Sequence, residues 1–122
     1  MTYSPPAVYE RHATVVRVVD GDTLHLSVDL GCDIEVAMTV RLSGLNAPEM
    51  STVEGKAAKA YVEQWVEERG PRFVVRTEKD KREKYGRYLA DLLPFDAEPF
   101  TDSLCQALLT YRYAVPYSGG KR

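Results

Sequence analysis

Two neighbouring segments alternate between apolar and polar residues, and this pattern constrains the fold more than any other feature of the chain. Residues 24–30 and residues 35–42 both alternate with strict period two. Such alternation is typical of half-buried β-strands. The Asp20-Gly21 pair ahead of the first segment predicts a tight turn. Residues 14–19, which are dense in β-branched side chains, predict a strand on the other side of that turn.

The period then changes to that of a helix. Apolar residues recur at spacings of three and four, which indicates a helical stripe made of Ala57, Ala58, Tyr61, Val62, Trp65 and Val66. Gly70-Pro71 should end this helix.

Two further strands and a second helix follow. The strands are expected at residues 73–77 and 88–93, the latter stopped by Pro94. The second helix should begin near Pro99 and carry Leu104, Cys105, Leu108 and Leu109. This order predicts a β-rich α+β protein, namely an OB-fold five-stranded barrel with a helix between strands three and four and a C-terminal helix.

Length and composition indicate one soluble globular domain. The 122 residues, with 44% hydrophobic and 28% charged residues, fit a single domain spanning 1–122 with its core at about residues 10–117. Residues 1–9 look like an N-terminal arm, to which we also assign His12, and residues 118–122 look like a tail. Cys32 and Cys105 are interpreted as free thiols, although a disulfide stays open.

The first residues contain no charged region followed by an apolar run, so we expect no signal peptide and a cytoplasmic protein, or a secreted one if a signal was removed. No apolar stretch approaches the roughly 20 residues of a membrane span. The compact size and the missing signal also fit a phage or mobile-element source. We expect a monomer without an obligate protein partner.

The net charge of −2 argues mildly against nucleic acid as a partner, since phosphate binding is chiefly electrostatic. Residues 76–87, however, hold six cations against three anions, with a tyrosine and a glycine. A solvated loop and a local phosphate-facing patch are equally good interpretations of this run.

Three short segments at strand ends carry the candidate chemistry. They are Val18-Val19-Asp20-Gly21-Asp22-Thr23, Val40-Arg41-Leu42-Ser43-Gly44-Leu45-Asn46-Ala47-Pro48-Glu49 and Lys84-Tyr85-Gly86-Arg87-Tyr88-Leu89-Ala90. Asp22, the amide oxygen of Asn46 and the backbone carbonyl of Ala47 are hard oxygen ligands suited to calcium or magnesium.

The other polar residues of these segments suit the hydrolysis of a phosphodiester. Glu49 could take a proton from an attacking water. Arg41 and Arg87 could hold phosphate oxygens and offset the charge that grows in the transition state. His25, which should face outward near the site, is not needed for this chemistry.

Each of these residues also has a plainer interpretation. Asp20, Asp22 and Asn46 could be turn formers. Glu49, Arg41 and Arg87 could be ordinary exposed charges. The functional interpretation depends on all three segments occurring together and in this order.

Taken together, the three segments resemble the staphylococcal-nuclease (thermonuclease) family over about residues 13–113. The resemblance implies calcium-dependent cleavage of DNA and RNA, preferably single-stranded, with little sequence preference; magnesium is the second choice. It implies that Asp22 and the Ala47 carbonyl ligate calcium, with Asp20 supporting from nearby. It makes Glu49 the general base, or the residue that orients the water.

The resemblance further implies that Arg41 and Arg87 bind the scissile phosphate and that Lys84 and Tyr85 bind the neighbouring one. Tyr113, and next to it Tyr111, would line the nucleotide pocket. One departure concerns the metal: Asn46 stands where the best-studied members have a second calcium-binding aspartate, so we expect weaker calcium binding. A nuclease-like module that binds nucleic acid or protein without cleavage is the alternative.

Overall fold

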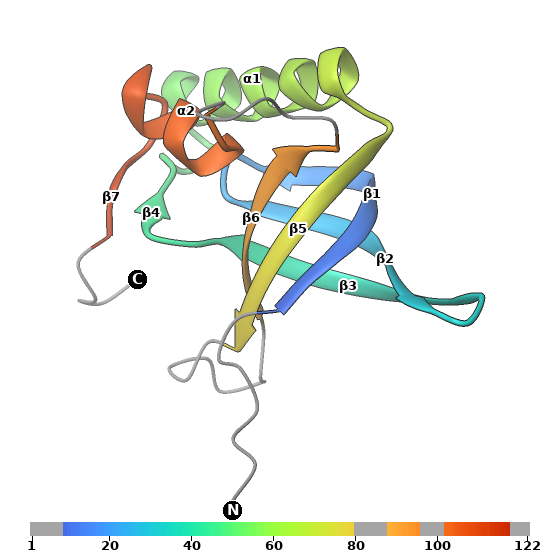
Figure 1. Cartoon of the computed structure of the whole chain (residues 1–122). Helices are drawn as coiled ribbons and strands as arrows, with labels where there is room; N and C mark the ends of the chain where they lie inside the picture. Colours follow the sequence, from blue (N-terminus) through green and yellow to red (C-terminus); the bar gives the residue numbers. More distant parts are fainter. Residues whose placement is uncertain (1–8, 80–87, 96–101, 118–122) are drawn as a thin grey trace, which may run out of the picture.

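The computed structural model describes residues 9–79, 88–95 and 102–117. In this part of the chain, five strands form a closed barrel in the order β1-β2-β3-β6-β5, and two helices lie at one end of it (Figure 1). The barrel strands are β1 (Tyr9–Asp20), β2 (Thr23–Gly31), β3 (Ile34–Leu42), β5 (Arg72–Lys79) and β6 (Tyr88–Pro94). The helices are α1 (Val53–Arg69) and α2 (Leu104–Thr110), and a separate pair of two-residue strands comprises β4 (Leu45–Asn46) and β7 (Val115–Pro116).

This architecture confirms the predicted OB-fold arrangement. The sheet is mixed, because β3 and β6 pair in parallel while the other neighbours in the barrel pair antiparallel. The helix α1 falls between the third and fourth barrel strands, as expected, and α2 follows the fifth. The short strands β4 and β7 were not predicted, since two residues are too few to show a period.

The strand β1 begins earlier than the sequence suggested. Residues 9–13 pair with β5, so His12 lies in a strand opposite Val74 and not in an arm. The side chains of Glu10, Arg11 and His12 are exposed and show no apolar alternation. Backbone hydrogen bonds to β5 extend the strand through these residues, and such bonds leave no periodic pattern in the sequence.

Local chemistry explains both ends of α1. The Thr52 hydroxyl accepts a hydrogen bond from the Gly55 amide at 2.9 Å and caps the first turn. Gly70 ends the helix by donating its amide to Val66. The buried face consists of Gly55, Ala58, Val62 and Trp65. The expected place of Ala57 in the buried stripe was wrong, because this residue is exposed.

The core fills the barrel and the space beneath the helices. Its largest fully buried side chains come from β2, β3, β5, β6 and both helices, and include Leu24, Leu26, Val40, Leu42, Val62, Phe73, Leu92, Leu104 and Leu108. Trp65 of α1 stacks on Phe73 of β5 with ring centroids 5.4 Å apart. Both cysteines are free, Cys32 exposed and Cys105 buried. Neither helix of the described residues combines the length and apolarity needed to cross a membrane.

Truncation of the core aromatic should reveal how strongly α1 is bound to the barrel. Phe73 is fully buried and stacks on Trp65, so Phe73→Ala should lower the free energy of unfolding by about 3–5 kcal/mol. Urea denaturation measures this loss. Val53→Ala is the matched control, because Val53 is 80% exposed at the start of α1. A loss for Phe73→Ala no larger than that of the control would contradict the packing described.

Candidate active site

The turn between β1 and β2 presents two carboxylates at one end of the barrel. The Asp22 amide donates to Asp20 Oδ1 at 3.0 Å, which closes the turn. The Asp22 carbonyl accepts from the Leu42 amide at 2.8 Å and ties the turn to the end of β3. Gly21 is required here, because a Cβ at this position would lie 2.8 Å from the Cβ atoms of Ala47 and Ala58.

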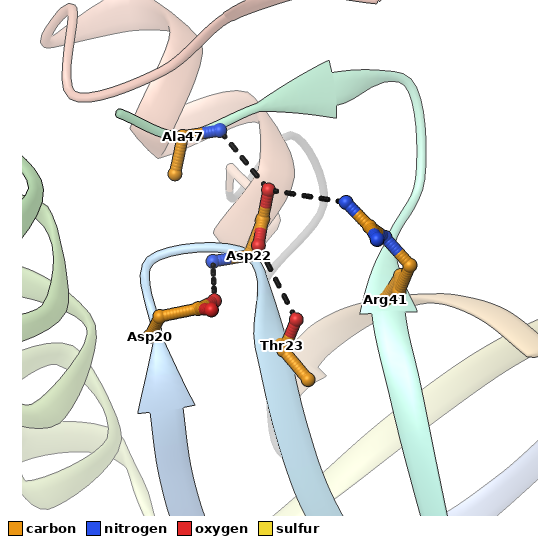
Figure 2. A network of polar contacts seen from close by, with 5 residues as sticks. All are labelled: Asp20, Asp22, Thr23, Arg41 and Ala47. Atoms are coloured by element: carbon orange, nitrogen blue, oxygen red, sulfur yellow. Dashed lines mark hydrogen bonds and ion pairs between the residues drawn. The ribbon is translucent and has the colours of Figure 1, made fainter. Parts of the chain in front are cut away.

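The Asp22 side chain connects three segments that are distant in the sequence (Figure 2). Its Oδ2 accepts from the Ala47 amide at 3.1 Å and lies 3.6 Å from Nη2 of Arg41. Its Oδ1 accepts from the Thr23 hydroxyl at 3.3 Å. The network thus brings together Asp20, Asp22, Arg41 and Ala47, all four of which the sequence had placed in the site.

The two carboxylates differ in their preference for a proton. Burial raises the pKa of Asp22, and the neighbouring Asp20 carboxylate raises it further, against the lowering effect of the Ala47 amide and Arg41. Burial also opposes ionisation of Asp20, but hydrogen bonds from Asp22 and Thr23 and the charge of Arg41 outweigh it and lower the pKa of Asp20. A positive charge bound between them would favour the ionised form of Asp22 and lower its pKa.

Arg41 has an unsatisfied donor in this site. Its side chain is 21% exposed, and its Nε is a buried atom without a hydrogen-bond partner among the described residues. A buried donor without a partner costs free energy, so an acceptor for this group would stabilise the site. An oxyanion is the natural acceptor for a guanidinium.

A cavity of about 460 Å³ opens beside these groups. It is lined by Val19, Asp20, Asp22, Thr23, His25, Thr39 and Arg41. Thr39 was not among the predicted site residues, and His25 had been set aside. The period-two pattern could have found both, because it assigns His25, Thr39 and Arg41 to the same outer face of the sheet.

The loop after β4 carries the remaining predicted residues. Asn46 is half-buried and pairs with Val115 of β7. The side chain of Glu49 is exposed, and no described hydrogen bond or ion pair joins it to the Asp22 network. The backbone of Glu49 is held firmly, because its carbonyl accepts from the Thr52 amide at 3.0 Å and from the Thr52 hydroxyl at 2.6 Å.

Helix α1 packs directly on this loop through Gly55. A Cβ at Gly55 would overlap the Glu49 carbonyl oxygen and lie 2.5 Å from the carbonyl carbon. Neither Thr52 nor Gly55 was predicted to shape the site. Their spacing is that of an ordinary capped helix start, and only the folded structure shows that both contact the Glu49 carbonyl.

The two tyrosines lie elsewhere. Tyr113 stacks on Tyr61 with centroids 4.4 Å apart, and Tyr111 is 65% exposed nearby. They line a separate cavity of about 360 Å³ together with Tyr61, Gln64, Trp65, Glu68 and Arg69. This cavity shares no lining residue with the one beside Asp22.

Lys84, Tyr85 and Arg87 lie outside the described residues. The first described residue after them, Tyr88, pairs with Val40, and Leu89 pairs with Arg41. The strand β6 therefore begins beside the strand that carries Arg41.

The site offers oxygen donors, which hard cations prefer, but it has few carboxylates. Asp20 and Asp22 supply carboxylate oxygens, and Asn46 and the Ala47 carbonyl could supply neutral ones. Among the described residues, no group of three or more His, Cys, Asp or Glu side chains forms a metal cluster. These oxygen donors are of the type that calcium or magnesium takes, but the described part of the site supplies only the two carboxylates of Asp20 and Asp22.

No known protein-family model matches the chain, and a search of curated proteins finds no significant match.

Removing the charge of Asp22 should stabilise the fold. Folding raises the pKa of Asp22, so the folded protein favours the protonated form of this carboxyl. At pH 7 the carboxyl is charged, and the charged form lowers the free energy of unfolding. Asp22→Asn should therefore raise the Tm at pH 7, and the gain should vanish below about pH 4, where aspartates bind a proton even unfolded. Glu63→Gln, which removes an exposed carboxylate on α1, is the control. A lower Tm for Asp22→Asn at pH 7 would mean that the Arg41 and Ala47 contacts dominate.

A methyl group at Gly55 should displace the loop that bears Glu49. Gly55→Ala creates the overlap described above, and overpacking of this kind typically costs about 1–3 kcal/mol. Urea unfolding and the amide NMR shifts of Ala47 and Glu49 measure the effect. Val53→Ile adds one carbon at an exposed position of the same helical turn and should change neither. Unmoved Ala47 and Glu49 resonances in Gly55→Ala would refute the close packing.

Proposed function

We propose that this protein is a metal-dependent endonuclease that hydrolyses phosphodiester bonds of DNA and RNA with little sequence preference. The observation that carries the proposal is the buried Nε of Arg41, which has no hydrogen-bond partner in the described part of the chain and lies next to the Asp20–Asp22 carboxylates. A phosphate oxygen would satisfy this donor. A cation held by the carboxylates would meet the same phosphate group.

The reaction would be an in-line displacement at phosphorus. Glu49 takes a proton from a water molecule, the water oxygen bonds to phosphorus, and the bond between phosphorus and the leaving oxygen breaks. The leaving oxygen takes up a proton from solvent and departs as a hydroxyl. Arg41 donates hydrogen bonds to the phosphate oxygens, on which negative charge grows. The exposed position of Glu49 leaves its carboxylate accessible to water, while Thr52 fixes its backbone.

Asp22, Asn46 and the Ala47 carbonyl would hold the calcium ion, with Asp20 in support. When bound, a calcium ion polarises the phosphate and offsets its charge. The hydrogen bond that the Ala47 amide donates to Asp22 keeps this carboxylate oriented toward the loop. Arg87, Lys84 and Tyr85 complete the proposed phosphate contacts, and Tyr113 and Tyr111 the proposed nucleotide contacts.

Cleavage of single-stranded DNA tests the proposal. Calcium should support cleavage and a chelator should abolish it. Arg41→Ala, Glu49→Ala and Arg87→Ala should each lower kcat about 100-fold or more without unfolding the protein. Arg11→Ala and Glu67→Ala, which remove exposed charges on β1 and α1, are the controls. Full activity of any of the three site variants would overturn that residue's role.

A binding module without catalysis is the second candidate. It is favoured by Asn46 in the place of an acid and by the lack of a three-ligand cluster among the described residues. Absence of cleavage at millimolar calcium, with nucleic-acid binding retained, would favour this candidate over the enzyme.

A further inference from the structure

We infer that the outer face of β1, β2 and β3 beside the site binds the next phosphate of a single-stranded nucleic acid, through Arg17, His25 and Thr39. This subsite rests on the proposed function for its position next to the scissile bond. Its own ligand, a nucleic-acid phosphate, can be tested without cleavage.

The strand register places these three residues in one row across the sheet. Arg17 of β1 lies opposite His25 of β2, and His25 lies opposite Thr39 of β3. Residues directly opposite each other on antiparallel strands project to the same face. His25 and Thr39 line the cavity that also holds Asp22 and Arg41.

The distance between this row and the site matches a nucleotide step. Thr23 and Arg41 form the next pair on the same face of the sheet, two residues along β2 and β3. Two residues of a strand span about 7 Å, which is comparable to the separation of adjacent phosphates in an extended single strand. A strand whose one phosphate contacts Arg41 would therefore place its next phosphate over this row.

The chemistry of the row suits a phosphate. Arg17 is exposed and forms no ion pair with any residue that the structure describes, so its guanidinium can bind an anion. His25 offers a ring N–H and Thr39 a hydroxyl as hydrogen-bond donors. These contacts involve the phosphate and no base, which agrees with a protein that has little sequence preference.

The same register limits how far the strand can follow this face. Four residues further along β2, Asp29 lies opposite both Glu35 and His12. This acidic row is about 14 Å from His25 and would repel a phosphate. The subsite thus accommodates one or two nucleotides beyond the site.

Fluorescence anisotropy with labelled oligonucleotides tests the subsite in a chelator, where no cleavage can occur. The probes are a dinucleotide and an octanucleotide, each as DNA and as RNA. Arg17→Ala and His25→Gln should weaken binding of the octanucleotides on the order of tenfold. Arg17→Ala should also lower the slope of log K against log salt by about 0.7, the value for one phosphate on a single strand.

The dinucleotide and Arg11→Ala supply the controls. Arg11 is an exposed arginine of the same strand, near its other end, and its loss should leave every affinity unchanged. The dinucleotide should bind the Arg17 and His25 variants as it binds the parent, because its single internucleotide phosphate would contact Arg41 and it has no second one for the row. Equal losses on DNA and RNA indicate contacts to phosphate.

The inference is overturned if Arg17→Ala binds the octanucleotides as tightly as Arg11→Ala does, or if the parent protein binds no octanucleotide. The nuclease activity is tested separately, and it is refuted if calcium supports no cleavage that a chelator abolishes. Such a result leaves the anisotropy comparison to decide the subsite.

Discussion

The contacts of one carboxylate, that of Asp22, hold the candidate site together. Its side chain accepts a hydrogen bond from the Ala47 amide at 3.1 Å and meets Arg41 at 3.6 Å, while its backbone carbonyl accepts from Leu42 at 2.8 Å. A turn, the end of a strand and a loop are thereby brought to one place. Helix α1 supports the same junction, since Ala58 packs against the turn at Gly21.

This arrangement has a cost that points to function. Burial and the nearby Asp20 carboxylate raise the pKa of Asp22, and Arg41 holds a buried Nε without a described partner. In the proposed function, a bound cation would offset the charge of Asp22, and a phosphate would supply an acceptor for Arg41.

Much of this could be predicted from the sequence, for reasons that are visible in particular residues. Period two identified β2 and β3, and the same alternation correctly sent Arg41 to the outer face, where it meets Asp22. The strand pairing of residues 9–13 has no apolar period and was missed. The roles of Thr52 and Gly55 were missed as well, because their contact with the Glu49 carbonyl exists only once the helix packs on the loop.

The proposed function depends on Arg41 binding a phosphate next to a cation. NMR of the Arg41 Nε–H group measures this most directly, during titration with a phosphorothioate-linked dinucleotide that resists hydrolysis, with calcium present. Phosphate binding at Arg41 should produce a saturable downfield shift and slower solvent exchange of this proton, both weakened in Asp22→Ala. An Nε–H resonance that does not respond to the dinucleotide with calcium present would contradict it.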